Sequence, residues 1–190
     1  MRHPPVVDVG ALVDPAAPSA LRLQAARAID AAARSWGFFY AAHHGVDRAL
    51  VDRTVALARA FFAQDEAQKM RLPMSAGGLA WRGYFPAGDE LTSGRPDWKE
   101  GLYLGSELPA DHPRVRAGVI LHGPNLWPAI PDFRETVLAY IAALSGLGQA
   151  LMRGCASGAC AAEKRACAGA WERARLGAGG AVWSIHTRSL

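Results

Sequence analysis

The feature that most constrains this chain is a long amphipathic helix near its middle, with too little sheet around it to cover its apolar face. From Pro131 onward, apolar side chains recur at helical spacing. They are Phe133, Val137, Tyr140, Ile141, Leu144, Leu147 and Leu151. A proline at position 131 suits the first turn of a helix. Because a domain needs two packed layers, we expect a further, sheet-like layer after Gly154.

The residues before this helix predict a mixture of short strands and helices. A helix should begin near Ser19 and end at Gly37, and two more should follow Asp47 and Asp65, which are plausible N-caps. Strands are predicted in three segments, "PPVVDVGAL" (4–12), "FFYAAHHGV" (38–46) and "DWKEGLYL" (97–104). The Gly- and Pro-rich stretches between them read as loops.

The last 36 residues have a different composition from the rest. They hold ten alanines, five glycines and three cysteines but no phenylalanine or tyrosine, and we find no strand-forming alternation in them. One interpretation is an alanine-rich helix that continues through Ala156 to Arg175. The other is a slip of the reading frame near codon 154 of a GC-rich gene, and the composition favours the slip. We therefore divide the chain into a domain over 1–154 and an atypical tail over 155–190.

Charge and composition argue against several classes of protein. The net charge is +4, but +3 of it lies in the tail, so no basic stripe crosses the body and nucleic-acid binding is not expected. We see no secretory signal and no segment of membrane-spanning length, so we expect a cytoplasmic protein with no membrane partner. The cysteine spacings match no common zinc or iron–sulfur pattern.

An ordered set of motifs in the body resembles a known family. In order they are "PPVVDVGAL", "ARSWGFFYAAHHGVD", the "FF" at 61–62, Lys69, "GYFPAGDELTSGRPDWKE" and "HGPNLWPAIPDFRETVLAYIAAL". Together they resemble the N-terminal region of the isopenicillin N synthase-like, Fe(II)/2-oxoglutarate-dependent dioxygenases, over residues 4 to about 154. The segments "GDELTSGRPD" and "RVRAGVILHGPNLWP" are most similar to the bacterial ethylene/succinate-forming branch.

The resemblance implies an α+β fold, in which a helix and strand region buttresses a jelly roll (double-stranded β-helix). The long helix would lie along that jelly roll, most of which is missing from this chain. The resemblance also implies Fe(II), held by an H-x-D motif and a distal histidine, and 2-oxoglutarate, held by Arg-x-Ser. The residues two places after the six histidines are Pro5, Gly45, Val46, Arg114, Pro124 and Arg188, so no H-x-D occurs. We therefore expect a chain truncated before the iron site, with no catalytic residue, metal ligand or cofactor of its own.

Few residues are candidates for binding. Glu90 and Thr92 correspond to residues that approach the arginine substrate in the ethylene-forming branch, and a carboxylate suits a guanidinium group. The alternative for both is hydrogen bonding that stabilises their loop. His43 and His44 are expected to fix a turn, and Asn125 and Trp127 a turn and a core contact. Lys99 and Glu100 are expected to be solvated charges on an edge strand.

Two functional hypotheses follow. The first is an N-terminal fragment of an Fe(II)/2-oxoglutarate-dependent dioxygenase, an oxidoreductase for a small-molecule substrate, which is inactive alone unless a separately encoded jelly roll completes it. The second is a non-enzymatic remnant that acts as a binding or assembly module through its exposed helix. Either version leaves the apolar face of helix 131–154 uncovered, so self-association through it is expected.

Overall fold

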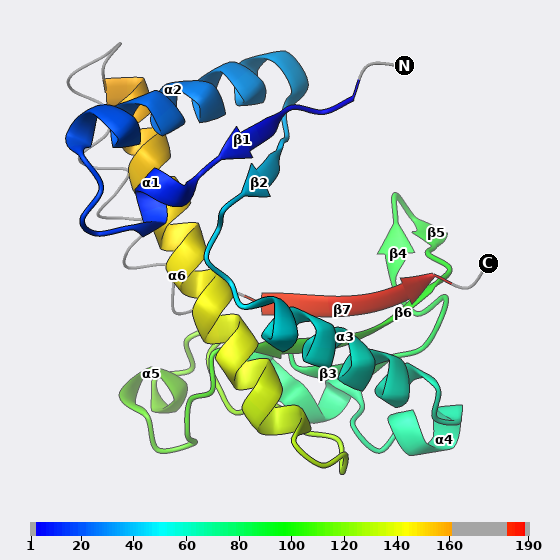
Figure 1. Cartoon of the computed structure of the whole chain (residues 1–190). Helices are drawn as coiled ribbons and strands as arrows, with labels where there is room; N and C mark the ends of the chain where they lie inside the picture. The colour runs from blue at the N-terminus through cyan, green and yellow to red at the C-terminus, as the bar shows by residue number, and fades with distance from the viewer. Residues whose placement is uncertain (1–2, 161–181, 189–190) are drawn as a thin grey trace. The chain divides into compact units, whose positions relative to one another are not determined.

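The computed structural model describes residues 3–160 and 182–188, and the chain trace is shown in Figure 1. The described residues belong to two compact units. One unit draws on Met1–Asp47 and Ala143–Gly177, and the other on Arg48–Ala142 and Ala178–Leu190. The units are described separately as unit 1 and unit 2.

Unit 1 is a helix packed on a two-stranded parallel sheet. Strand β1 (Val6–Asp8) leads into a short helix, α1 (Gly10–Val13), and then into α2 (Ser19–Trp36). Strand β2 (Tyr40–Ala42) pairs with β1 in parallel, with Val7 opposite Ala41. The core of unit 1 consists of Val7, Val9, Ile29 and Ala32, with Leu147 and Leu151 packed against it.

The beginning of unit 2 is helical. It contains α3 (Arg48–Phe62), α4 (Glu66–Lys69) and the 3-10 helix η1 (Met74–Ala80). Asp65 caps α4 as predicted, because its carboxylate accepts a hydrogen bond from the Gln68 N–H at 2.8 Å.

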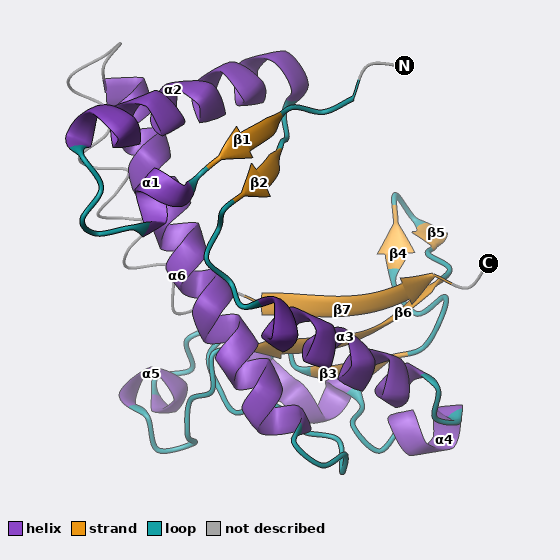
Figure 2. Cartoon of the chain, viewed as in Figure 1, coloured by secondary structure: helices purple, strands orange, loops and turns teal. Residues whose placement is uncertain are grey.

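A three-stranded antiparallel sheet forms the centre of unit 2, in the order β3 (Gly83–Phe85), β6 (Lys99–Gly105) and β7 (Val182–Arg188). A small hairpin of β4 (Leu91–Thr92) and β5 (Arg95–Pro96) lies between β3 and β6 in the chain (Figure 2). A short helix, α5 (Pro113–Arg116), and the long helix α6 (Phe133–Cys160) follow β6.

Most of the predicted elements are confirmed. Strands lie in all three predicted segments, and α2 ends at Gly37, which has the left-handed conformation (φ 78°) typical of a C-terminal glycine. Helix α6 begins at Phe133, two residues after the predicted Pro131, because the chain turns at Asp132 with a positive φ of 61°. It continues beyond Gly154 to Cys160.

The prediction that the apolar stripe of α6 is uncovered is wrong. Phe133, Val137 and Ile141 are 1 %, 3 % and 6 % exposed in the core of unit 2, where they meet Phe61, Tyr84, Leu102 and Leu104. Farther along the helix, Leu147 and Leu151 pack in unit 1. The stripe thus gives no support to the hypothesis of a module that binds through an exposed helix, and self-association remains an untested prediction.

The prediction that the tail lacks a strand is also wrong. Val182–Arg188 pairs antiparallel with β6 along all seven residues, from Lys99 opposite Arg188 to Gly105 opposite Val182. A sheet-like element therefore does follow Gly154. The helix predicted to continue toward Arg175 is present as far as Cys160, and its remainder lies outside the described residues. The boundary at residue 154 remains a prediction.

The expectation that no segment reaches membrane-spanning length needs correction as well. Within α6, Phe133–Ala156 is long and apolar enough, by length and composition alone, to cross a bilayer. A core helix of a soluble domain can meet the same criteria. Phe133, Val137 and Ile141 are core residues of unit 2, so this is weak support for a membrane span.

Candidate functional site

A cavity of about 400 Å³ in unit 2 contains the predicted residue Glu90. It is lined by Met74, Ser75, Gly78, Trp81, Phe85, Asp89 and Glu90. Two neighbouring carboxylates and two aromatic rings thus border one hollow. This combination suits an organic cation, because carboxylates accept hydrogen bonds from it and an aromatic face attracts it.

The alternation of side chains along β6 determines which residues approach this cavity. Lys99 and Tyr103 lie on one face of the strand, and Glu100, Leu102 and Leu104 lie on the other. Since Phe85 pairs with Gly101, its ring lies on the same face as Tyr103, and the two ring centroids are 5.1 Å apart. Tyr103 therefore supports the Phe85 wall of the cavity.

The carboxylate of Glu90 is held in place by two neighbours from β6. The Tyr103 hydroxyl donates a hydrogen bond to Glu90 Oε1 at 2.6 Å, and Lys99 Nζ lies 3.0 Å from Glu90 Oε2. Lys99 Nζ is also 3.1 Å from Asp97 Oδ2. Burial, together with the hydrogen bond to Glu90, raises the pKa of Tyr103 to about 12. The hydrogen bonds to Glu90 and Asp97 raise the pKa of Lys99.

Close backbone packing places Trp81 at the cavity. A Cβ on Gly77 would lie 2.0 Å from the carbonyl oxygen of Arg82, so only glycine allows this approach. Trp81 lies four residues after Gly77. It has a positive φ of 57°, and its side chain is 55 % exposed. Arg82 behind it is fully buried, and its guanidinium donates to the carbonyl oxygens of Ala80 at 2.6 Å and Leu121 at 3.1 Å. This anchor fixes the chain on both sides of Trp81.

The opposite face of β6 carries a second set of charged groups, in which Lys69 is buried and Glu100 is partly buried. Glu100 Oε2 lies 2.5 Å from Lys69 Nζ and accepts a hydrogen bond from the Tyr84 hydroxyl at 2.6 Å. Burial and the contact with Glu100 raise the pKa of Tyr84 well above its usual range. The prediction of an edge strand with solvated Lys99 and Glu100 is therefore wrong, since β6 is the central strand and both side chains form ion pairs.

The remaining predicted residues have local contacts. Thr92 lies in β4 beside Glu90, and its side chain is outside the described set. His43 Nδ1 is 2.9 Å from Asp8 Oδ2, and His44 Nδ1 accepts a hydrogen bond from the Val46 N–H, so both fix the turn as expected. Asn125 exchanges two hydrogen bonds of 2.7 Å with the backbone of Gly105 at the end of β6, so it ties its loop to the sheet, and its predicted role within a turn stays a prediction. Trp127 packs against the core of unit 2, which confirms its predicted core contact.

Sequence reasoning missed Trp81 and Asp89. The signal for Asp89 was available, because it precedes Glu90 in "GDE" and a turn brings both carboxylates near one point. Trp81 in "AWRGY" gave only a weak signal, since an aromatic residue beside a strand is usually part of a core.

The fold described above is that of the N-terminal, helix-and-strand region of a non-haem oxygenase. The chain belongs to the family described as "non-haem dioxygenase in morphine synthesis N-terminal", whose model matches residues 4–130. This confirms the resemblance to the family, and the mixture of helices and strands confirms the α+β fold class. The similarity to the ethylene/succinate-forming branch remains a prediction.

Relatives agree with this assignment. The chain is 47% identical over 132 residues to a Dictyostelium discoideum protein named as an iron/ascorbate oxidoreductase, covering 65% of this chain and 36% of that protein. It is 30% identical over 127 residues to the homoarginine-6-hydroxylase 2-ODD-C23.1 of Arabidopsis thaliana. This match covers 66% of this chain and 38% of the Arabidopsis protein. A crystal structure of a 2OG-Fe(II) oxygenase family protein from Caulobacter crescentus matches with a TM-score of 0.64 at 28% identity, covering 80% of this chain and 47% of that one.

The chain thus spans less than half the length of these relatives. The relatives named here include an iron/ascorbate oxidoreductase and a 2OG-Fe(II) oxygenase family protein, and the name of the Arabidopsis relative gives it a small-molecule substrate, homoarginine. Among the described residues of this chain, no group of three or more His, Cys, Asp or Glu side chains is arranged to hold a metal ion. The described residues therefore offer no iron site.

Proposed function

We propose that this chain provides the N-terminal region of an Fe(II)/2-oxoglutarate-dependent dioxygenase whose small-molecule substrate carries a guanidino group. In such an enzyme the iron and 2-oxoglutarate supply the oxidising chemistry, and this region contributes to the binding of substrate. The observation that carries the proposal is the cavity at Glu90, which combines two carboxylates with an aromatic wall in a chain of this family.

The geometry of Glu90 supports recognition of a cation. Tyr103 and Lys99 each engage one carboxylate oxygen, which fixes the carboxylate in a single orientation. Each oxygen of a carboxylate has two lone pairs, so both can accept a further hydrogen bond from a ligand. Asp89 is exposed beside it and adds a second negative charge. The name of the Arabidopsis relative, a homoarginine hydroxylase, is in keeping with a substrate of this kind.

Trp81 would contribute through the face of its indole ring. A guanidinium group stacks favourably on tryptophan, and the interaction contributes about 0.5–1 kcal/mol at exposed sites. With a side chain that is 55 % exposed at the border of the cavity, Trp81 is available for such a contact.

The test is a titration of the full chain with homoarginine, followed through the indole N–H signal of Trp81 in NMR spectra, assigned with Trp81→Phe. Homocitrulline, which has a neutral ureido group and the same length, is the matched ligand control. We expect homoarginine alone to shift the Trp81 signal, and Glu90→Gln to weaken binding about tenfold, the effect of losing one charge-assisted hydrogen bond.

Asp111→Asn is the matched protein control, because Asp111 is an exposed carboxylate elsewhere in unit 2. It should leave homoarginine binding unchanged. Equal binding of homoarginine and homocitrulline, or equal weakening by both substitutions, would contradict the proposed recognition of the cation.

A further inference from the structure

The two-stranded parallel sheet of unit 1 leaves the outer edge of β1 unpaired among the described residues. In the part of the chain that the structure describes, β1 pairs only with β2. Alternate residues along β1 direct their backbone groups toward β2. The Val9 N–H donates to the Ala42 carbonyl at 3.0 Å, and the Pro5 carbonyl accepts from the Tyr40 N–H at 2.9 Å. The backbone groups of Val6 and Asp8 therefore point to the other edge. Such an edge is a template for a further strand.

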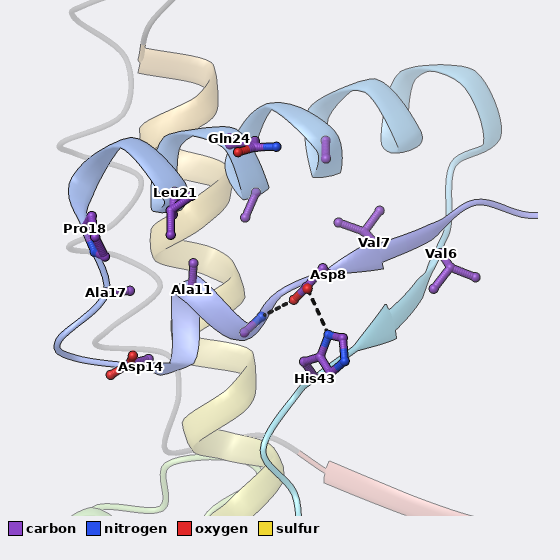
Figure 3. A pocket seen from close by; sticks show the side chains of 13 residues that line it. Val6, Val7, Asp8, Ala11, Asp14, Ala17, Pro18, Leu21, Gln24 and His43 are labelled. Atoms are coloured by element: carbon purple, nitrogen blue, oxygen red, sulfur yellow. Dashed lines mark hydrogen bonds and ion pairs between the residues drawn. The ribbon is translucent and has the colours of Figure 1, made fainter.

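A groove of about 680 Å³ runs along β1 within the same unit. On the β1 side it is lined by Val6, Val7 and Asp8. Helix α2, which packs on β1, supplies a stripe of one helical face: Leu21, Gln24, Ala25 and Ala28. Figure 3 shows the side chains of Leu21 and Ala11 directed toward each other across this space. The small alanine side chains leave room for the side chains of an added strand.

The charge of the groove is one-sided. Its lining includes the carboxylates of Asp8 and Asp14, and neither lysine nor arginine. Asp8 accepts a hydrogen bond from the Gly10 N–H at 2.9 Å and contacts His43, as Figure 3 shows, and its side chain remains 66% exposed. Asp14 is likewise exposed, with one oxygen bonded to the Ala16 N–H. Both carboxylates keep lone pairs for a basic side chain.

We propose that the open edge of β1 accepts an extended strand of a separate polypeptide, one in which apolar residues alternate and a lysine or arginine meets Asp8. The backbone groups of Val6 and Asp8 supply the main-chain hydrogen bonds, the alanine-lined wall of α2 receives the apolar side chains, and the carboxylates select the basic residue. This site is in unit 1 and is independent of the cavity at Glu90.

The test is a titration of the full chain with an acetylated and amidated hexapeptide of alternating valine and threonine with one central arginine. A hexapeptide with glutamate in place of arginine is its control. Hydrogen exchange of the Val6 and Asp8 amides reports on the edge directly. We expect the arginine peptide to slow exchange at both amides about tenfold, and the glutamate peptide to have no effect.

Two substitutions on α2 give a matched pair. Ala28→Arg fills the groove and adds a repelling charge, whereas Ala31→Arg places the same side chain at an exposed position of α2 outside the groove. Only Ala28→Arg should weaken peptide binding, by about tenfold or more. Binding without protection of the Val6 and Asp8 amides would overturn the proposal, and so would equal binding of both peptides. Self-association of the free chain that Ala28→Arg abolishes would show that a second copy, not a basic peptide, occupies the edge.

Discussion

Two clusters of the same three residue types lie on opposite faces of β6, and they differ chiefly in burial. In one, Glu100 binds Lys69 and Tyr84, and the lysine and glutamate side chains are 8% and 16% exposed. In the other, Glu90 binds Lys99 and Tyr103, and the corresponding values are 26% and 28%. The chemistry is shared, so the difference between the clusters shows what burial does to it.

Burial makes the first cluster a structural element. A lysine that has lost its water needs the carboxylate, because an unpaired buried charge costs several kcal/mol. The second cluster keeps contact with solvent, where an ion pair contributes about 0–1 kcal/mol. Its Glu90 also lines a cavity. The more exposed cluster is the one at which we propose that a ligand binds, because changes there cost little stability.

The largest expected effect comes from breaking the buried cluster. Glu100→Gln leaves Lys69 charged in a buried site, so the free energy of unfolding should decrease by about 3–5 kcal/mol. Urea unfolding of the full chain measures this. The double variant Glu100→Gln with Lys69→Met is the control, since removing both charges should recover part of the loss. A decrease below about 1 kcal/mol would mean that Glu100 behaves like a surface charge.

The same substitution, tyrosine to phenylalanine, can be made in each cluster, and its effect on the free energy of unfolding compares the two. Tyr84→Phe deletes a hydrogen bond to a buried carboxylate and should lower the free energy of unfolding by about 1.5–3 kcal/mol. Tyr103→Phe deletes the equivalent bond to Glu90, which water can replace, and should cost about 0.5–1 kcal/mol. Parallel urea titrations give both values. Equal losses would show that burial does not separate the clusters.

Glu90→Gln compares the effect of one substitution on stability with its effect on ligand binding. Lys99 retains Asp97 as a partner, so the loss of stability should be about 0.5 kcal/mol. The same variant should weaken homoarginine binding about tenfold, as proposed above. Thermal unfolding and the NMR titration are measured on the same sample. A large loss of stability without a change in binding would assign Glu90 to the structure alone.

Sequence patterns predicted the elements of this fold that depend on local signals. Gly37 marked the end of α2, and the alternation in "DWKEGLYL" indicated β6. Glu90 was found through the resemblance, and the cavity beside it through the structure.

The missed features depend on contacts between distant parts of the chain. Lys69 and Glu100 are 31 residues apart, so no local pattern links them, and β6 seemed an edge strand because β7 was not expected. The alternation in "VWSIHTR" was obscured by the alanine- and glycine-rich residues before it. Its pairing with β6 supplies the register that composition alone could not.

The last comparison concerns alkaline pH. Burial and Glu90 raise the pKa of Tyr103 to about 12, whereas an unfolded tyrosine ionises near pH 10. The folded chain thus favours the protonated phenol. Its stabilising contribution is complete below pH 10 and is lost as the pH rises from about 10 to 12. Tyr84, whose pKa is raised further, should lose its contribution at still higher pH.

Ultraviolet titration at the tyrosinate band, with Tyr84→Phe and Tyr103→Phe for assignment, separates the two steps. Tyr103 should ionise first, in a folded chain, because its cluster is more exposed than that of Tyr84. Ionisation of Tyr84 should coincide with the loss of the circular dichroism signal, because a phenolate beside the buried Glu100 carboxylate places two negative charges in the core. Ionisation of Tyr84 in a chain that stays folded would mean that Lys69 and water can accommodate that charge, and the contrast between the two faces of β6 would be lost.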